Sequence, residues 1–520
     1  MRNLIKHLLP ARLKYVLKKL WALAKKGRNL VRRVIRLSLN LVKRLVRLAR
    51  HSLKRTLGRI FFVPAQLLII CKNIFKSDRP LSHLGSDSIF VDPKLSSDPN
   101  AQAVISVGAD FQQSRSRTAF IISYTGISNE PRVLRQASSL SAAGWKVVIF
   151  GHQGNSENPT DCLFVRVPVT DPYLPVFRKW LLICRSNFGG LGRYVPFLTD
   201  VAASADFGFH YTGSVIVAEG KKLAAIYGCD LILCHDYFTS RPALSLHRKL
   251  GAPICLDSHE YATQQLMHSR RWRIIQRPII QTVQRRRFPQ LDGLTTVSDG
   301  ICDLLNEEYK LKRKCITVRS IPQKRDIAYR DVGDRIRVLY QGNVDYIRGL
   351  HKAIKSMPLW PENVDLIIRG YPQPGYIDDL KSLVATLGLT HRVHFADTVR
   401  FTELIETANE ADIGYYVHKD VSPQKHFVLP NKFFEYIQAG LALCVNDLPS
   451  MAKIVRQYSL GVLVEDYSEE AIADAINSLT KEKIREFKRA SIEAREELCW
   501  ENESKKLMSY YESIVEGRAT

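Results

Sequence analysis

Residues 429–440, LPNKFFEYIQAG, place a helix start, a cation and a carboxylate close together in the chain. Pro430 suits the first turn of a helix, where no N–H is needed, and the closing glycine suits the end. Because a helix N-terminus has free amides and a partial positive charge, it can hold a phosphate. Asn431 and Lys432 lie at that end. Glu435 follows about one turn later, where its carboxylate could accept hydrogen bonds from sugar hydroxyls. An ordinary core helix with exposed charges is the alternative interpretation.

A second group of candidate residues follows the predicted strand 336–340. Gly342 comes just after this strand, and a glycine there lets a phosphate approach the backbone. Arg348 begins the next helical stretch and could neutralise a diphosphate, although a single arginine in a first turn is usually solvent-exposed. The spacing is not G-x-G-x-x-G, so a nicotinamide cofactor has little support.

A third candidate site lies at the end of the predicted strand 253–257. His259 follows Asp257 by two positions. A histidine flanked by carboxylates at a strand's carboxyl end could orient or deprotonate an acceptor hydroxyl. A histidine held by a loop hydrogen bond is the alternative. His235 and Asp236, after the preceding strand, form a weaker candidate of the same kind.

Arg132 opens the predicted helix 132–143, in the first βα unit. At that position it could contact a substrate, or it could be a solvated first-turn residue. Both interpretations stay open.

These candidates all depend on an alternation of short apolar strands with helices. Short apolar runs bounded by turns are typical of buried parallel strands, and such sheets bind ligands at the strands' carboxyl ends. The predicted strands are 118–124, 146–151, 231–234, 253–257, 294–297 and 316–321, then 336–340, 364–369, 392–395, 412–417, 441–446 and 461–465. A chain of 520 residues can hold two such units. We therefore expect an α/β protein of two facing Rossmann-like domains with a cleft between them.

The chain divides into five predicted segments. They are a basic helical extension (1–77), a linker rich in Ser, Asp, Pro and Gln (78–117), a first Rossmann-like domain (118–330), a second Rossmann-like domain (331–480), and C-terminal helices (481–520).

Basic charge is concentrated in the extension. Residues 1–77 contain 21 Lys and Arg and no Asp or Glu, so the remainder holds 55 basic and 51 acidic residues. Apolar and basic residues alternate at helical spacing, which favours a helix lying in an anionic membrane interface. The most apolar run, 60–71, is interrupted by Pro64 and is too short to span a bilayer comfortably. A protein contact, with a partner or with the body, and nucleic acid are the alternatives. Sparse aromatic residues argue against base stacking and hence against nucleic acid.

The ten cysteines form no CxxC pair, and no Cys/His group has zinc spacing. This usage favours a reducing compartment and predicts no structural metal.

Several residue strings resemble the GT-B glycosyltransferases, specifically the retaining nucleotide-sugar transferases called family 4, over roughly residues 118–515. The strings are NEPRVLRQASSLSAAGWKVV (129–148), LTTVS (294–298), VRSIP (318–322), VLYQGNVDYIRG (338–349) and PNKFFEYIQAG (430–440). The last resembles the donor-binding helix of the family and is the most specific.

The resemblance implies roles for individual residues. Glu435 would bind the ribose of the nucleotide, Arg348 with the Gly342 loop would meet the diphosphate, and His259 would lie by the acceptor and the transferred sugar. The family often has a second glutamate eight positions before the helix glutamate. Here that position is Phe427. This departure puts the usual contact to the sugar ring in doubt, and is compatible with a subgroup of the form PNK-x-FEY and with lost activity.

The implied activity is hexosyl transfer, with retention, from a nucleotide-diphosphate sugar to a lipid-linked or polysaccharide acceptor, in the synthesis of cell-surface glycans. No cofactor and no metal would be needed, because fixed cations can stabilise the leaving diphosphate. The expected location is cytoplasmic, peripheral on the inner face of the plasma membrane. A catalytically inactive GT-B-like scaffold in a membrane assembly is the alternative. A sugar-nucleotide epimerase of the same fold is weakened by the extension and the PNKFFEY string.

Overall fold

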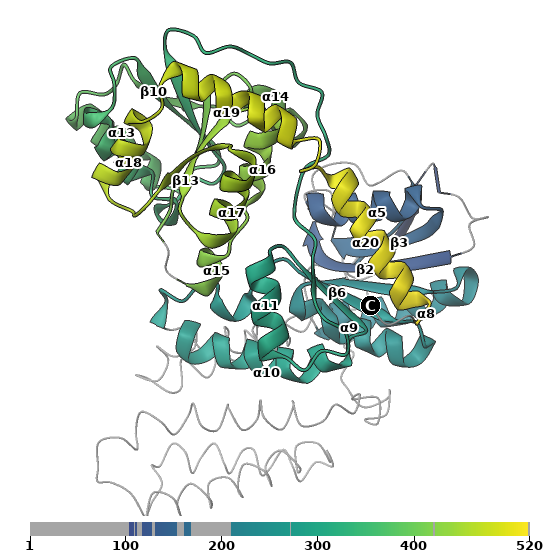
Figure 1. Ribbon diagram of the computed structural model, residues 1–520. Helices are drawn as coiled ribbons and strands as arrows, with labels where there is room; N and C mark the ends of the chain where they lie inside the picture. Colours follow the sequence, from purple (N-terminus) through teal and green to yellow (C-terminus); the bar gives the residue numbers. More distant parts are fainter. Residues whose placement is uncertain are drawn as a thin grey trace, which may run out of the picture. The chain divides into compact units, whose positions relative to one another are not determined.

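The computed structural model describes residues 103–108, 110–111, 117–126, 130–152, 161–167, 210–270, 272–419 and 422–517. Two α/β sheets organise this part of the chain (Figure 1). The predicted extension, 1–77, lies outside the described residues. Within them, no helix is both long enough and apolar enough to cross a membrane.

The first sheet has the strand order β1-β4-β3-β2-β5-β6-β7-β8. All neighbouring strands are parallel except β1, which pairs antiparallel with β4. The strands are β1 (Val104–Val107), β2 (Arg117–Gly126), β3 (Trp145–His152), β4 (Leu163–Arg166), β5 (Leu231–His235), β6 (Ile254–Ser258), β7 (Gly293–Thr296) and β8 (Ile316–Thr317). Its helices are α5 (Pro131–Ala142), α8 (His210–Tyr227), α9 (Asp236–Leu250), α10 (Arg277–Arg287) and α11 (Asp299–Glu308). Its other elements among the described residues are 3-10 helices at Ala262–Gln264 and Phe288–Gln290 and a π-helix at Trp272–Gln276.

The central strands of this sheet, β2, β3, β5, β6 and β7, are buried on both faces. Along β2, Phe120 and Ile122 enter one hydrophobic cluster, whereas Ala119 and Ile121 enter another. Successive side chains of a strand point to opposite faces, so a strand covered on both sides must be apolar throughout. This is why the strands could be recognised as continuous apolar runs.

The second sheet is parallel throughout, with the order β11-β10-β9-β12-β13-β14. Its strands are β9 (Ile336–Gln341), β10 (Val364–Arg369), β11 (Val393–Ala396), β12 (Ile413–Tyr416), β13 (Ala442–Asn446) and β14 (Gly461–Val464). Its helices are α12 (Leu350–Ser356), α13 (Tyr376–Thr386), α14 (Leu404–Ala408), α15 (Pro423–His426), α16 (Asn431–Gln438), α17 (Pro449–Tyr458), α18 (Glu469–Asn477) and α19 (Lys481–Ala494), with 3-10 turns at Tyr346–Arg348, Met357–Leu359 and Phe401–Glu403.

The last helix, α20 (Trp500–Val515), returns to the first sheet (Figure 1, yellow). Trp500 donates from its indole nitrogen to Ser139 Oγ at 2.9 Å, and the Tyr510 hydroxyl accepts from Leu294 N at 3.1 Å. The apolar side chains of α20 join the cluster on one face of the first sheet. The end of the chain therefore completes the core of the first domain.

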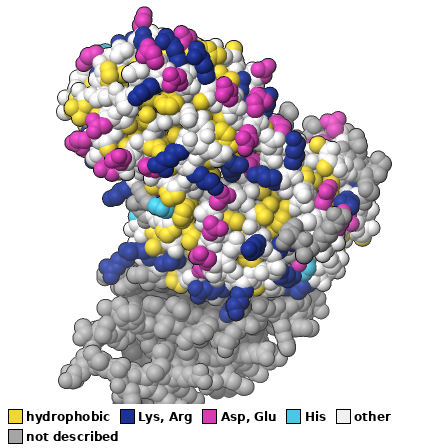
Figure 2. Space-filling model, in the orientation of Figure 1, with side chains coloured by type: hydrophobic (Ala, Val, Ile, Leu, Met, Phe, Trp, Pro, Cys, Tyr) yellow, Lys and Arg dark blue, Asp and Glu magenta, His cyan; other side chains and the backbone are white. Residues whose placement is uncertain are grey.

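The structure confirms the expected α/β architecture with two Rossmann-like sheets, and it differs from the sequence-based expectations in three places. Leu163–Arg166, where no strand was predicted, form β4. Val104–Val107, placed in the linker, form strand β1. The predicted strand 316–321 is shortened to Ile316–Thr317, because the Arg319 amide donates to the Glu503 carboxylate at 2.9 Å instead of continuing the ladder. On the face drawn in Figure 2, basic and acidic side chains are interspersed over the described body.

Candidate functional site

Helix α16 carries two buried charges on consecutive turns. Pro430 has extended backbone (φ −75°, ψ 148°) and precedes the first helical residue, so it caps the helix rather than lying in its first turn. Asn431 is exposed, but Lys432 and Glu435 are only 9% and 8% exposed. The interpretation of this helix as one with exposed charges is therefore wrong for its two charged residues.

The ammonium group of Lys432 lies among aromatic rings. Its Nζ is 4.7 Å from the ring centre of Tyr340 and 5.0 Å from that of Tyr416, distances at which a cation is attracted to the ring face. It also donates to the Tyr340 hydroxyl at 3.4 Å. Burial, with the nearby Arg348 guanidinium, lowers the pKa of Lys432 to about 7. The ammonium group can therefore lose its proton near neutral pH.

Gly342 is required beside this ammonium group. Its φ is +132°, and a Cβ there would lie 2.5 Å from Lys432 Nζ. Gly370 approaches even more closely, since its Cβ would lie 1.7 Å from the carbonyl oxygen of Gly342. The two glycines bring the ends of β9 and β10 together, and the Gly342 amide donates to Arg369 O at 2.9 Å.

Glu435 is connected to Arg369 through Gln341. The Gln341 amide nitrogen donates to Glu435 at 3.4 Å, while its oxygen accepts from Arg369 at 3.5 Å. Burial raises the pKa of Glu435, and Lys432 and the Gln341 hydrogen bond oppose that change. Gln341 was not among the site residues predicted from sequence, although its position directly before Gly342 at the strand's end was a usable signal.

Arg348 lies in the 3-10 turn that Asp345 caps, where the Asp345 carboxylate accepts from the Arg348 amide at 3.2 Å. Its guanidinium donates to the Tyr416 hydroxyl at 2.9 Å. Tyr416 thus contacts both Arg348 and the Lys432 ammonium group. The candidates Gly342, Arg348, Lys432 and Glu435 are assembled through shared neighbours at the carboxyl end of β9, and Tyr340 and Tyr416 are further members that sequence reasoning missed. Cations beside a buried carboxylate suit a ligand that combines phosphates with hydroxyl groups.

The second cluster lies at the carboxyl ends of β5, β6 and β7. Asp257 accepts hydrogen bonds from Arg132 Nε (2.5 Å) and Nη2 (2.7 Å), from Gln136 (2.5 Å) and from Thr295 Oγ1 (2.7 Å). Burial alone would raise its pKa, but Arg132 and His259 hold the pKa well below the ordinary value. Arg132 is 3% exposed, so it is not a solvated first-turn residue. Its partner is Asp257, and both side chains are buried beneath the site, where they hold each other in place.

His259 is held between carboxylates and a second histidine. Its Nε2 lies 3.0 Å from His235 Nδ1 and 3.6 Å from Asp257 Oδ2, and its Nδ1 lies 3.8 Å from Asp236 Oδ2. Burial lowers the pKa of His259, but Asp236 and Asp257 outweigh burial and raise the pKa to about 9. At neutral pH His259 is therefore an imidazolium, which can donate to a ligand hydroxyl.

Ligand atoms of His235, Asp257 and His259 lie within 4.8 Å of one another, a spacing that could hold a metal ion. The four donors on Asp257 already occupy the usual acceptor positions of a carboxylate, and the Arg132 guanidinium would repel a cation. The residues present thus fit a hydrogen-bonded network better than a metal centre.

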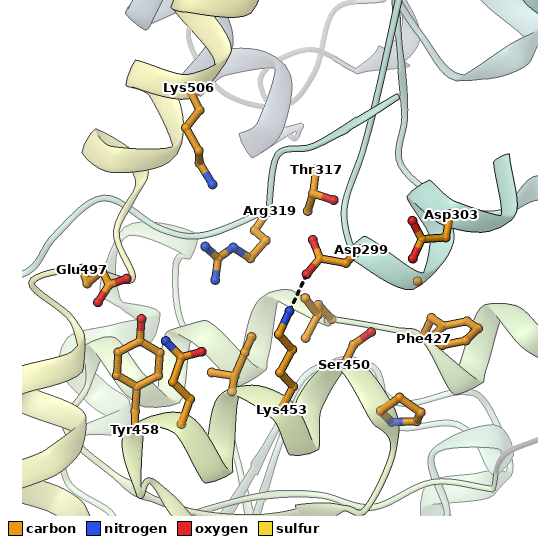
Figure 3. A pocket seen from close by; sticks show the side chains of 15 residues that line it. Asp299, Asp303, Thr317, Arg319, Phe427, Ser450, Lys453, Tyr458, Glu497 and Lys506 are labelled. Atoms are coloured by element: carbon orange, nitrogen blue, oxygen red, sulfur yellow. Dashed lines mark hydrogen bonds and ion pairs between the residues drawn. The ribbon is translucent and has the colours of Figure 1, made fainter. Parts of the chain in front are cut away.

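A separate pocket of about 440 Å³ lies among α11, α17 and α20 (Figure 3). Lys453 donates to Asp299 across it at 3.0 Å. Phe427 forms part of its wall, and a Cβ on Gly300 would lie 2.1 Å from the Phe427 ring. The ring of Phe427 therefore packs against α11. The pocket contains none of the candidate donor or acceptor residues.

Comparisons with known proteins relate the second domain to a protein family. Residues 324–497 match the family model for glycosyl transferases group 1. We call this matched part of the second domain the group 1 domain, after the family model that it resembles. Gly342, Arg348, Lys432 and Glu435 all belong to it. An uncharacterised glycosyltransferase of Methanocaldococcus jannaschii is 24% identical over 198 residues, which are 37% of this chain and 48% of that protein. The chain thus matches about half the length of this relative.

Solved structures extend the likeness to both sheets. Sucrose-phosphate synthase from Thermosynechococcus elongatus aligns with a TM-score of 0.59 at 16% identity, over 77% of this chain and all of that one. Anabaena HepE in complex with UDP and glucose aligns with a TM-score of 0.54 at 13% identity, over 76% of this chain and 100% of that one. At these identities the likeness shows the fold. The group 1 domain and the first domain together form the GT-B fold.

Proposed function

We propose that this protein is a glycosyltransferase that moves a hexose from a nucleotide-diphosphate donor to an acceptor hydroxyl. One observation supports the proposal most strongly: Lys432, Arg348 and Glu435 lie near Gly342 in the group 1 domain and are connected through shared neighbours. The buried Lys432 and the half-buried Arg348, beside a glycine backbone that has no Cβ, suit a diphosphate. A buried carboxylate suits ribose hydroxyls.

The residues then have distinct roles in the proposed transfer. Arg348 and Lys432 stabilise the negative charge that develops on the leaving diphosphate, and this electrostatic contribution is usually the largest in such reactions. These fixed cations make a metal ion unnecessary. Glu435 holds the ribose, and His259 orients the acceptor or a hydroxyl of the transferred sugar. Retention of configuration is proposed from the family 4 resemblance, and PNK-x-FEY defines the proposed subgroup.

The donor class to test first is UDP-sugars. Support comes from the fold-level likeness to HepE, whose structure holds UDP and glucose. The experiment is a thermal-shift and hydrolysis screen of the full-length chain against UDP-, GDP-, ADP- and dTDP-sugars, with Glu435→Ala in parallel. We expect one nucleotide class to stabilise the protein, with loss of that effect in the variant and slow release of sugar. A folded chain that responds to no nucleotide would contradict the proposal and favour the inactive scaffold.

We further propose a lipid-linked or polysaccharide acceptor and a peripheral location on the cytoplasmic face of the plasma membrane. The charge distribution supports this, because residues 1–77 carry 21 basic and no acidic residues. Deletion of residues 1–77 should reduce binding to anionic vesicles and transfer to a lipid acceptor, while nucleotide binding, which reports folding, is retained. Unchanged vesicle binding and unchanged transfer would refute the membrane role.

A further inference from the structure

His235 is a buried histidine that the proposed transfer does not use. It ends β5, and its Cα pairs with that of Asp257 on β6. Its side chain is only 2% exposed, compared with 20% for His259. Nδ1 of His235 lies 3.0 Å from Nε2 of His259, and its own Nε2 has no hydrogen-bond partner among the described residues. A group so enclosed can reach a ligand only through its neighbour.

The charges around the pair decide which nitrogen donates. Asp236 and Asp257 flank His259. Arg132 on α5, Glu130 just before that helix, and the adjacent Glu260 also interact electrostatically with His259. The carboxylates keep His259 protonated on both nitrogens. Burial and the His259 cation lower the pKa of His235 to about 3, against the opposing effect of Asp257, so His235 is neutral. Nδ1 of His235 must therefore accept the Nε2 proton of His259, and its own proton lies on Nε2.

We propose that His235 is a positioning residue: it accepts the Nε2 proton of His259 and thereby presents Nδ1 of His259 to the ligand hydroxyl. Nδ1 is the ring nitrogen of His259 that remains able to donate to a ligand, because its nearest acidic neighbour, Asp236, is 3.8 Å away, beyond hydrogen-bond distance. The same Asp236 accepts from the His259 backbone amide at 3.1 Å and has a left-handed backbone, φ +62°. A non-glycine residue held in that region is strained, as expected where a carboxylate must be placed for a neighbour. The identity of the ligand rests on the proposed function; the arrangement of the two rings does not.

The first test uses the wild-type full-length chain with ¹⁵N-labelled histidine. A hydrogen bond between ring nitrogens gives a scalar coupling between His235 Nδ1 and His259 Nε2, and we expect to observe it without any ligand. Its absence, with Nε2 of His259 exchanging its proton freely with water, would overturn the proposal.

The second test uses variants. His235→Asn retains an acceptor near the Nδ1 position, whereas His235→Leu removes it and retains bulk. His247→Asn is the matched control, because His247 is a half-buried histidine on α9 whose Nδ1 contacts Ala252 O at 2.8 Å. In His235→Leu we expect exchange of the His259 Nε2 proton to accelerate at least tenfold and its titration to move to lower pH, with neither change in His235→Asn or the control. A His259 signal that is unchanged in folded His235→Leu would also overturn the proposal.

Turnover separates this inference from the proposed function. His235→Leu should lower kcat tenfold or more with little change in the KM for the donor, and His235→Asn should restore most of the loss. If the wild type lacks transferase activity while the coupling and the exchange results hold, the proposed function fails and the positioning role stands.

Discussion

The ammonium nitrogen of Lys432 lies 4.7 Å from the ring centre of Tyr340. Burial lowers the Lys432 pKa to about 7, from an ordinary value of 10.5. A bound diphosphate would favour the protonated form again. We therefore expect nucleoside diphosphate binding above pH 7 to take up about one proton and to weaken as pH rises. Calorimetry in buffers of different ionisation enthalpy measures this uptake. It should disappear in Lys432→Met and persist in Lys483→Met, an exposed lysine on α19.

The same residue predicts how the stability of the free protein depends on pH. Between about pH 7 and 10.5 the unfolded chain keeps the Lys432 proton that the folded chain has released. The free energy of unfolding therefore rises with pH across that window. The gain due to Lys432 is full above pH 10.5, shrinks as the pH falls, and is absent below pH 7. Urea denaturation at pH 6.5 and pH 9 should show a smaller difference in Lys432→Met than in the wild type. An equal difference would mean that Lys432 is not buried as described.

Glu435→Gln should weaken nucleotide binding without unfolding the group 1 domain. The substitution keeps the shape of the side chain and removes a charged acceptor, which is typically worth about 1.5–3 kcal/mol per hydrogen bond. We expect affinity for the nucleoside diphosphate to fall about 10- to 100-fold. The melting temperature should be unchanged or higher, because a desolvated carboxylate is removed. Glu410→Gln, at an exposed position, is the control; equal affinity in both variants would exclude a contact between Glu435 and the ligand.

The glycines at the ends of β9 and β10 should respond differently to alanine. Gly370→Ala would force a Cβ to 1.7 Å from a backbone oxygen, so we expect a loss of at least about 3 kcal/mol in unfolding free energy. In Gly342→Ala the new Cβ would meet only the flexible end of Lys432. We therefore expect the free energy of unfolding to fall by about 1–3 kcal/mol, because of the φ of +132°, and nucleotide binding to weaken. Gly388→Ala is the control, with φ +70° and open space around the Cβ. Wild-type nucleotide affinity in Gly342→Ala would contradict the predicted diphosphate site.

Phe427→Glu, which introduces the glutamate that the resembling family often has, should destabilise the protein rather than raise turnover. The ring packs against Gly300 and the hydrophobic cluster of the first sheet. Phe427 is half-buried, and a carboxylate placed against these apolar groups would be partly desolvated, which costs about 1–3 kcal/mol. Phe427→Leu retains an apolar side chain and should be tolerated better. Thermal unfolding and sugar release are the measurements, and higher turnover at unchanged stability in Phe427→Glu would show that this position contacts the donor.

Arg132→Met should be strongly destabilising. It would leave Asp257, 3% exposed, without the guanidinium that makes two of its four hydrogen bonds. Breaking a buried ion pair from one side costs about 3–5 kcal/mol. Arg456→Met removes the partner of Asp447 at 2.7 Å on the surface, where a pair is worth only about 0–1 kcal/mol. Chemical denaturation of both variants tests the contrast, and equal losses would refute the buried network.

The sequence by itself was sufficient for the class of fold, and it named most of the residues that the structure brings together at the carboxyl end of β9. Strands buried on both faces must be apolar along their length, so they could be read locally. Parallel strands end at one edge of the sheet, which is why Gly342, Arg348 and Glu435 could be expected near one another.

Other features were decided only by tertiary structure, because they depend on partners far away in the chain. The pairing register places His235, Asp257 and Thr295 side by side on three strands. Burial turns Lys432 and Glu435 inward, and α20 completes the core of the first domain. Phe427 meets Gly300 across 127 positions of sequence. Hydrophobic period is a local property of the chain, whereas register, desolvation and close packing arise only when distant segments meet.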